Sequence, residues 1–110
     1  MIQEVIWLEK AKKDFKKTVE YVKENWGNSS AEKFTDKVEK EINLLKSMPK
    51  IRAIIDEEKN IRRSVIVKQI SLYYMEIEIE KKLIIIRLLD NRQDPGKIGR
   101  ALNVESLYIN

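Results

Sequence analysis

One segment of the sequence is almost entirely apolar and limits how the chain can fold. Residues 83–89 read LIIIRLL, so Arg87 is the only charged residue among them. A strand with one face in solvent alternates apolar and polar residues, whereas a strand covered on both faces is apolar throughout. We therefore expect residues 83–89 to form a central strand. A chain of 110 residues has the size of one domain, so this strand belongs to a single core.

The first half of the sequence predicts a strand followed by two helices. Glu4–Leu8 is short and rich in β-branched and aromatic residues, which is typical of a strand. Gly27 suits the end of the first helix, Ser29 and Glu32 have the spacing of a capping box for the second, and Pro49 stops it. So short a connection predicts an antiparallel helical hairpin. The apolar faces, spaced by three or four residues, are Ala11, Phe15, Val19, Val22 and Trp26, then Ala31, Phe34, Val38, Ile42 and Leu45.

The second half of the sequence predicts three strands in an antiparallel meander. Ile61–Val67 is the first strand. Residues 70–80 are the second, and their alternation predicts one buried and one solvated face. The apolar residues 83–89 are the third, and short turns join all three strands. The preceding residues 50–60 are expected to be a linker that holds a helical turn or an edge strand.

Together these elements predict an α+β fold with the order β-α-α-β-β-β. The sheet is expected to be mostly antiparallel, with the helical hairpin on one of its faces. Residues 1–110 form a single domain, with a core over residues 4–98 and a tail over residues 99–110. For residues 97–110 three structures remain open: a short helix, a strand, or a segment that orders only on a partner.

Composition excludes several kinds of site. The sequence has no cysteine and no histidine, which excludes disulfides, thiolate or histidine metal sites and a Ser-His-Asp triad. The acidic residues lack the spacing of a calcium-binding loop and there is no glycine-rich phosphate loop, so we expect no metal and no cofactor. The net charge of +4 is compatible with contact to nucleic acid or to an acidic protein. We find no membrane-spanning run and no signal peptide, and we expect a cytoplasmic protein without membrane contact.

Four arginines are the main candidates for functional residues. Arg62 and Arg63 lie in the first strand of the meander, and Arg87 and Arg92 lie in and just beyond the last. A guanidinium group stays charged at all working pH values and can bind a phosphate or a carboxylate through two hydrogen bonds. The alternative is that these arginines pair with acidic side chains of the domain. Arg87 in particular needs a partner or a surface, because it interrupts an apolar strand.

Two adjacent aromatic residues are candidates of a different kind. Tyr73 and Tyr74 are expected on opposite faces of their strand, because side chains alternate along it. The interpretation we favour for both rings is packing in the core, because aromatic residues are common in strands. The alternative, which we assign to Tyr74, is that one ring stacks on a base or borders a partner-binding groove.

The apolar strand ends in an unusually polar stretch, DNRQDPGK. Asp90, Asn91 and Asp94 are expected to hold the end of the strand through hydrogen bonds to backbone groups. Pro95–Gly96 is expected to turn the chain toward the tail. Arg92 is not needed for such a turn, and it is therefore a candidate for binding.

Several stretches, taken in order, resemble the RelE/ParE family of bacterial toxins from type II toxin–antitoxin modules. They are VIWLEKAKKDF, SAEKFTDKVEKEINLLKSMPKI, IRRSVI, ISLYYMEI and IIIRLLDNRQDPGKI. The last of them resembles the ParE-like branch, of the plasmid stabilisation type. The resemblance implies a cognate antitoxin that neutralises the toxin by wrapping a partly disordered segment over it. It also implies that operator DNA is contacted only indirectly, through the antitoxin.

The resemblance leaves three activities open. ParE-like members inhibit DNA gyrase by binding, and RelE-like members cleave mRNA on the ribosome. Arg62 and Arg92 lie near basic positions of the nuclease pattern, but Ser71 stands where that pattern has an arginine, and Tyr108 is too far from Arg92 to match its tyrosine. We therefore favour gyrase inhibition, with an endoribonuclease and a non-toxic antitoxin-binding homologue as alternatives.

The expected functional residues follow from these alternatives. If the chain is an enzyme, its catalytic candidates are Arg62, Arg63, Arg87 and Arg92. The residues assigned to target or RNA binding are Arg62, Arg63, Tyr74, Arg87, Asn91 and Arg92.

Overall fold

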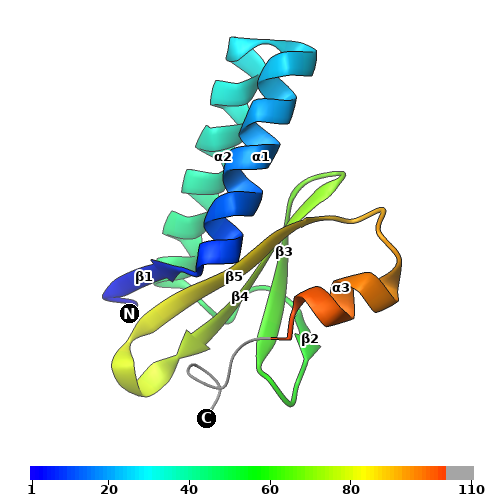
Figure 1. Cartoon of the computed structure of the whole chain (residues 1–110). Helices are drawn as coiled ribbons and strands as arrows, with labels where there is room; N and C mark the ends of the chain where they lie inside the picture. Colours follow the sequence, from blue (N-terminus) through cyan, green and yellow to red (C-terminus); the bar gives the residue numbers. More distant parts are fainter. Residues whose placement is uncertain (104–110) are drawn as a thin grey trace.

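The computed structural model describes residues 1–103 and shows an α+β fold (Figure 1). Five strands form one sheet in the order β1-β5-β4-β3-β2, in which β1 runs parallel to β5 and the other neighbours are antiparallel. The expected hairpin and meander are confirmed, and β2 is the edge strand that the linker allowed. The elements are β1 (Glu4–Trp7), α1 (Glu9–Trp26), α2 (Asn28–Ser47), β2 (Ile54–Asp56), β3 (Ile61–Val67), β4 (Ile70–Ile77), the 3₁₀ turn η1 (Glu78–Glu80), β5 (Lys82–Asp90) and α3 (Pro95–Ala101).

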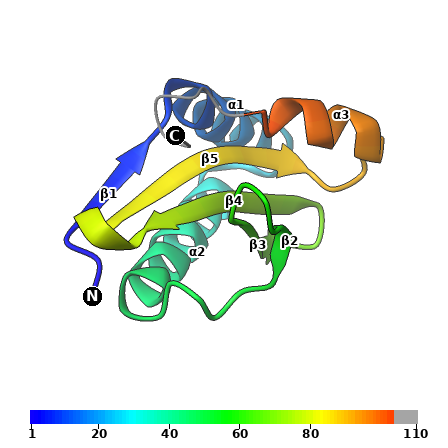
Figure 2. The same ribbon diagram turned by 90° about the horizontal axis from the view of Figure 1, so that it is seen from below.

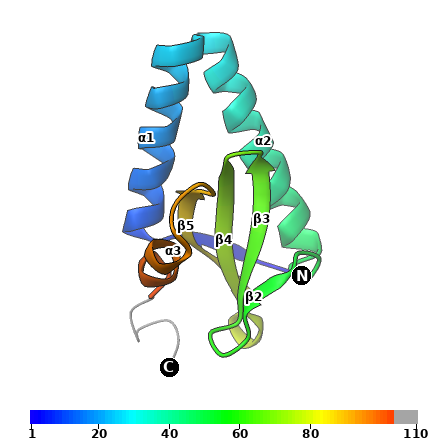
Figure 3. The same ribbon diagram turned by 90° about the vertical axis from the view of Figure 1, so that its right-hand side faces the viewer.

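The helical hairpin covers one face of the sheet, and the end where α1 meets α2 extends beyond the strands (Figures 1 and 3). Gly27 alone separates the two helices and has a φ of +91°, a conformation that suits glycine. The expected capping box is wrong, because α2 begins at Asn28 and Ser29 already lies inside the helix. None of the helices described in residues 1–103 is long and apolar enough to cross a membrane.

The sheet has a hydrophobic core on each face. Seen from below, β4 and β5 run side by side in front of the two hairpin helices (Figure 2). The core between the hairpin and the sheet is formed by Ile2, Ala11, Phe34, Val38, Leu45, Leu72, Tyr74, Leu83, Ile85 and Leu88. On the other face, where Ile98 and Ala101 of α3 add to the packing, lie Ile61, Tyr73, Met75, Ile84, Ile86, Leu89 and Leu102. The segment of residues 83–89 is thus a strand with neighbours on both sides and cover on both faces, as expected.

The second strand of the meander departs from expectation in two ways. Residues 71–75 are all buried, so the prediction of a solvated face is wrong for them; the residues of α3 supply the second cover. The strand also ends at Ile77 rather than at Glu80, because Glu78–Glu80 forms a 3₁₀ turn beyond the last residue paired with β5. Ile79 is consequently 93% exposed.

A turn at residues 91–93 follows β5, and Pro95 and Gly96 then begin the helix α3. Asp94 accepts a hydrogen bond from the backbone N–H of Lys97. Pro95 lies in the first turn of α3, where a backbone N–H has no partner within the helix, so the missing N–H of proline costs nothing there. The expectation of a simple turn at Pro95–Gly96 is therefore wrong. Of the tail, residues 99–103 are described, and Ala101 and Leu102 pack against the sheet. Residues 104–110, including Tyr108, lie outside the described residues, so the partner-ordered alternative stays a prediction there.

Candidate partner-binding groove

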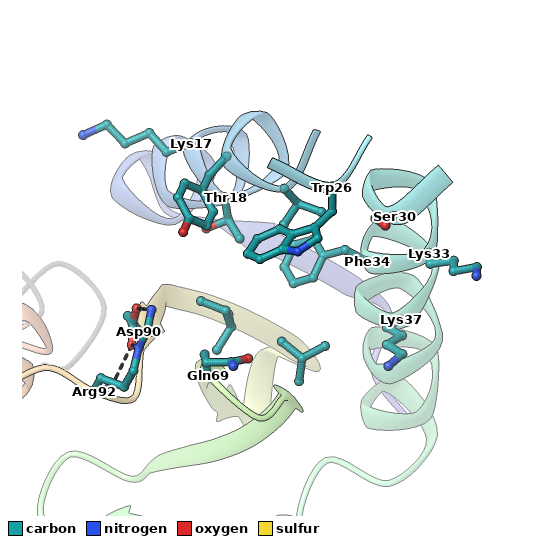
Figure 4. Close-up of a pocket in the computed structure, with 14 residues that line it drawn as sticks. Lys17, Thr18, Trp26, Ser30, Lys33, Phe34, Lys37, Gln69, Asp90 and Arg92 are labelled. Atoms are coloured by element: carbon teal, nitrogen blue, oxygen red, sulfur yellow. Dashed lines mark hydrogen bonds and ion pairs between the residues drawn. The ribbon is translucent and has the colours of Figure 1, made fainter. Parts of the chain in front are cut away.

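A groove of about 680 Å³ lies between the hairpin and the end of the sheet where β3 turns into β4 (Figure 4). It extends to the end of β5, so five elements contribute to its walls. Its lining residues are Lys17, Thr18, Tyr21, Val22 and Trp26 of α1, Ser30, Lys33, Phe34 and Lys37 of α2, Val67, Gln69 and Ile70 of β3, β4 and their turn, and Asp90 and Arg92 at the end of β5.

The aromatic side chains at the far end of the hairpin are open to solvent. Trp26 is 63% exposed and Tyr21 54% exposed, and their rings lie edge to face with centroids 5.6 Å apart. Phe34 lies deeper, 5% exposed, and stacks on Phe15 at 6.2 Å. Because the hairpin extends past the strands, the apolar face of α1 continues where no strand covers it. Trp26, which the helical pattern placed in the core, therefore borders the groove.

Four cations stand along the groove against a single carboxylate. Lys17 and Lys33 extend outward from opposite sides of the opening, while Trp26 and Phe34 point toward its middle (Figure 4). The other two cations are Lys37 and Arg92, and the carboxylate is Asp90. An apolar floor with a basic rim is the result. Sequence reasoning missed these lysines and Tyr21; the signal that was present is an apolar helix face that ends in aromatic residues flanked by lysines.

Arg92 is held at the groove by its neighbour Asp90. The guanidinium donates from Nε at 3.0 Å and from Nη2 at 2.7 Å to the two oxygens of Asp90, and the backbone N–H of Arg92 donates to Oδ1 at 2.8 Å. The hydrogen bonds from Arg92 keep the pKa of the Asp90 carboxyl below its ordinary value. The Arg92 side chain remains 70% exposed. It is therefore positioned in advance and available for contact.

Asn91 anchors the same strand end. Its side-chain amide donates to the carbonyl of Lys68 at 3.0 Å, and its Oδ1 accepts from the buried Ser71 hydroxyl at 2.6 Å. Its backbone N–H donates to the carbonyl of Gln69 at 2.6 Å. The expected tethering of the strand end through backbone groups is confirmed for Asp90 and Asn91, whereas Asp94 caps α3 instead. Asn91 thus fixes the wall of the groove rather than lining it.

Arg87 joins β5 to the hairpin. Its Nε and Nη2 donate to the two carboxylate oxygens of Asp14 at 2.6 and 3.0 Å, and the same carboxylate accepts the backbone N–H of Leu88 at 3.1 Å. The pairing of β1 with β5 ends at Ile85, so Asp14 bonds to β5 beyond the end of its parallel neighbour. The two side chains are only 19% and 15% exposed. Asp14 is therefore the partner that we expected Arg87 to have.

Arg62 and Arg63 lie away from the groove. On β3, Arg62 and Arg63 pair with Tyr74 and Tyr73 of β4. The groove lies at the other end of β3, where Val67 pairs with Ile70 and Ile70 pairs with Asp90. Arg62 and Val67 are five positions apart along the strand, a distance of about 17 Å. The Arg62 guanidinium donates to the carbonyls of Lys50 and Arg52 at 3.1 and 2.7 Å, and Arg63 is exposed. The structure therefore does not bring the four candidate arginines into one cluster.

Tyr74 is fully buried, so the expectation that its ring contacts a target or a base is wrong. Its hydroxyl donates to the carbonyl of Pro49 at 2.8 Å. Burial raises the pKa of Tyr74 to about 12, although the nearby Arg62 acts in the opposite direction. Both tyrosines are core residues on opposite faces of β4, and the expectation of opposite faces is confirmed.

A second, partly buried ion pair lies near the edge of the sheet, close to Tyr74. Glu41 of α2 accepts from Arg52 at 2.6 and 2.9 Å and also from the buried hydroxyl of Ser64. Burial raises the pKa of Glu41, but the hydrogen bonds from Arg52 and Ser64 outweigh it and leave this pKa below its ordinary value. With Ser64 at 0% exposure, the cluster has the character of a structural link between α2 and β3.

The described residues contain no group of three or more acidic, histidine or cysteine side chains that could hold a metal ion. A comparison with curated proteins found no match. Residues 5–95 match the sequence profile of a family described as the ParE toxin of the type II toxin–antitoxin system parDE. Because this match covers most of the chain, and because the fold agrees with it, the chain belongs to the ParE toxin family of type II toxin–antitoxin systems.

Proposed function

We propose that this toxin-family protein acts in the cytoplasm by binding DNA gyrase, and that a cognate antitoxin neutralises it. The observation that supports binding over catalysis is the placement of the candidate arginines. Arg62 is held by backbone carbonyls, Arg87 by Asp14 and Arg92 by Asp90, at three separate places. What the surface offers instead is an open groove with a basic rim and exposed aromatic rings.

An endoribonuclease would need a different arrangement of the same residues. Cleavage at a ribose 2′-hydroxyl requires a group that takes up a proton and cations that converge on one phosphate, and positioned proton transfer contributes about 10² to 10⁴ in rate. The arginines lie on β3, on β5 and beyond β5, and the strand β4 lies between Arg63 and the end of β5 that carries Arg92. This separation favours gyrase binding as the mode of toxicity.

The proposal is tested with purified protein and two target assays. We expect inhibition of DNA supercoiling by gyrase at concentrations that leave ribosome-bound mRNA intact. Induction in cells is expected to give double-strand DNA breaks and filamentation with intact mRNA. Cleavage within translated codons would overturn the proposal in favour of the endoribonuclease, and harmless expression would indicate the non-toxic, antitoxin-binding homologue.

The proposed antitoxin has a separate genetic test. A short reading frame for an acidic, DNA-binding protein is expected beside this gene, and its product should restore growth when both are expressed. A gene neighbourhood without such a reading frame would contradict the module. Operator DNA binding is expected only for the complex, because we assign it to the antitoxin.

A further inference from the structure

We propose that the exposed face of α1 over residues 10–17 binds the phosphate backbone of duplex DNA. This segment reads KAKKDFKK and holds five lysines and a single acidic residue. The inference rests on the proposed function in one respect, since the duplex is the one on which gyrase acts. It adds a contact with the substrate of the target, outside the groove. A backbone contact carries no sequence information, so operator recognition stays with the antitoxin.

The lysines of this face are open to solvent. Four of them are exposed and form no ion pair within the described residues 1–103, namely Lys10, Lys13, Lys16 and Lys17. The fifth, Lys12, lies 3.2 Å from the carboxylate of Glu9. The acidic residue of the segment, Asp14, is only 15% exposed and is bound to Arg87. No carboxylate of residues 10–17 therefore neutralises the four lysines.

The fold does not explain this concentration of positive charge. Lys13 lies three positions from Lys10 and four from Lys17, and like charges at these spacings destabilise a helix. Lys10 is also in the first turn of α1, where the helix dipole disfavours a cation. The exposed face of α2 is balanced instead, with Glu32, Asp36 and Glu39 beside Lys33, Lys37 and Lys40. A charge pattern that costs helix stability indicates a surface used for binding.

The basic face is remote from the acidic end of the molecule. Asp14 accepts the backbone N–H of Leu88, so residues 10–17 lie beside the second half of β5. The acidic end is formed by residues at or beside the turns from β2 to β3 and from β4 to β5, namely Asp56, Glu57, Glu58, Glu76, Glu78 and Glu80. Both turns lie at the lower end of the sheet in Figure 3, below the hairpin. A polyanion that approaches α1 is therefore attracted without meeting this acidic end.

The chemistry of the face favours a nucleic acid over a protein or a membrane. Every exposed side chain of residues 10–17 is a lysine, whereas protein interfaces depend on buried apolar and aromatic anchors. Helices that lie in a membrane surface insert an apolar face. The apolar face of α1 is packed against the sheet through Ala11 and Phe15. Lysine binds phosphate as a point charge and needs no such anchor.

The density of charge favours a duplex over a single strand. Lys10 and Lys17 are seven positions apart, so they span about 10 Å along α1. Duplex DNA carries one negative charge per about 1.7 Å of its axis, which is twice the density of a single strand. A helix laid along a duplex therefore meets about six phosphate charges over this span. Each of the four lysines has a phosphate within reach of its flexible side chain.

The test measures binding of the full chain to DNA without gyrase. The probe is a fluorescent duplex of about 20 base pairs, titrated at salt concentrations from about 50 to about 200 mM. The logarithm of the binding constant is expected to fall with the logarithm of the salt concentration with a slope of about −3 to −4, as four neutralised phosphates imply. A second duplex of unrelated sequence is expected to bind equally well.

Protein variants locate the contact to α1. The triple variant Lys10→Gln, Lys13→Gln and Lys16→Gln removes three charges that lie outside the groove. We expect a slope nearer to about −1 and an affinity at least about tenfold lower at low salt. Lys40→Gln is the matched control, from the balanced face of α2. The denaturation midpoint of the triple variant should equal or exceed that of wild type, because repulsion within α1 is relieved.

The outcomes separate this inference from the proposed function. Equal salt slopes for the triple variant and the control overturn the inference, and so does a preference for single-stranded DNA, duplex RNA or anionic vesicles over duplex DNA. A protein that binds duplex DNA through these lysines but leaves gyrase active upholds the inference and contradicts the proposed function. A protein that inhibits gyrase and does not bind duplex DNA overturns the inference alone.

Discussion

At the scale of single residues, one carboxylate adds a polar link between the hairpin and β5. Asp14 accepts two hydrogen bonds from Arg87 and one from the backbone of Leu88, so it satisfies both the buried cation and an N–H beyond the end of β1. A charge in an apolar strand is tolerated only with such a partner. The sequence predicted that Arg87 needs a partner, but it could not identify Asp14, which lies 73 residues away.

Replacing Asp14 is therefore expected to destabilise the protein strongly. Asp14→Ala should lower the free energy of unfolding by about 3 kcal/mol, because it leaves the Arg87 cation without its partner at a mostly buried position. The measurement is urea denaturation, with Asp36→Ala on the exposed side of α2 as control. Arg87→Met in addition to Asp14→Ala should cost less than the sum of the two single changes. Equal stability of the two alanine variants would contradict this role.

Arg92 is expected to matter for activity and not for stability. Arg92→Ala should abolish toxicity, because it removes the exposed guanidinium from the groove, while the denaturation midpoint stays unchanged. Growth after induction and thermal unfolding measure the two effects. Arg100→Ala, an exposed arginine of α3 outside the groove, serves as control. An unfolded Arg92→Ala protein would show instead that Arg92 is a structural anchor.

At the scale of elements, local patterns predicted the hairpin and the meander, and distant contacts decided the rest. The spacing of Ala11, Phe15 and Val19 predicts a helix because it arises within a few turns. The burial of Tyr73 depends on the residues of α3, which are more than twenty positions away and too few for a periodic signal. The groove likewise arises because the hairpin is longer than the sheet it covers, and a helical pattern does not show where the opposite layer ends.

The edge strand β2 depends on the Glu41 cluster. Glu41→Gln should lower the free energy of unfolding by about 2 kcal/mol, because the bonds from Arg52 and Ser64 lose their charged acceptor. Amide hydrogen exchange in β2 should accelerate more than in β5. Glu39→Gln, exposed on the same helix, is the control. Uniform acceleration over the whole sheet would contradict a local anchor.

The contribution of the Glu41 carboxylate to stability depends on pH in the acid range. The pKa of Glu41 is lower in the folded protein than its ordinary value of 4.5, so its stabilisation is present above that pH and is lost as pH falls through the folded pKa. The difference in unfolding free energy between wild type and Glu41→Gln should therefore shrink on acidification below about pH 4.5. A difference that stays constant with pH would show that Glu41 does not titrate in this way.

At the scale of the whole molecule, the two ion pairs that link the hairpin to the sheet are separate from the charged rim of the groove. The pairs Asp14–Arg87 and Glu41–Arg52 join the hairpin to β5 and to the segment before β2, away from the solvent-facing groove. The rim lysines have no part in these two links. Charge changes at the rim are therefore expected to alter binding while the fold persists, and changes at the links to do the reverse.

Tyr74 makes global stability sensitive to alkaline pH. Its pKa is raised by burial from 10.0 to about 12, so the folded protein favours the neutral phenol. The corresponding stabilisation is complete below pH 10 and is lost as pH rises from 10 toward 12, a change of about 2 kcal/mol at the upper limit. Tyr74→Phe removes the hydroxyl and its bond to Pro49, so it should be less stable than wild type near neutral pH. Because phenylalanine does not titrate, wild type should lose its advantage over Tyr74→Phe between pH 10 and 12 in denaturant titrations, and parallel pH profiles for the two proteins would contradict this assignment.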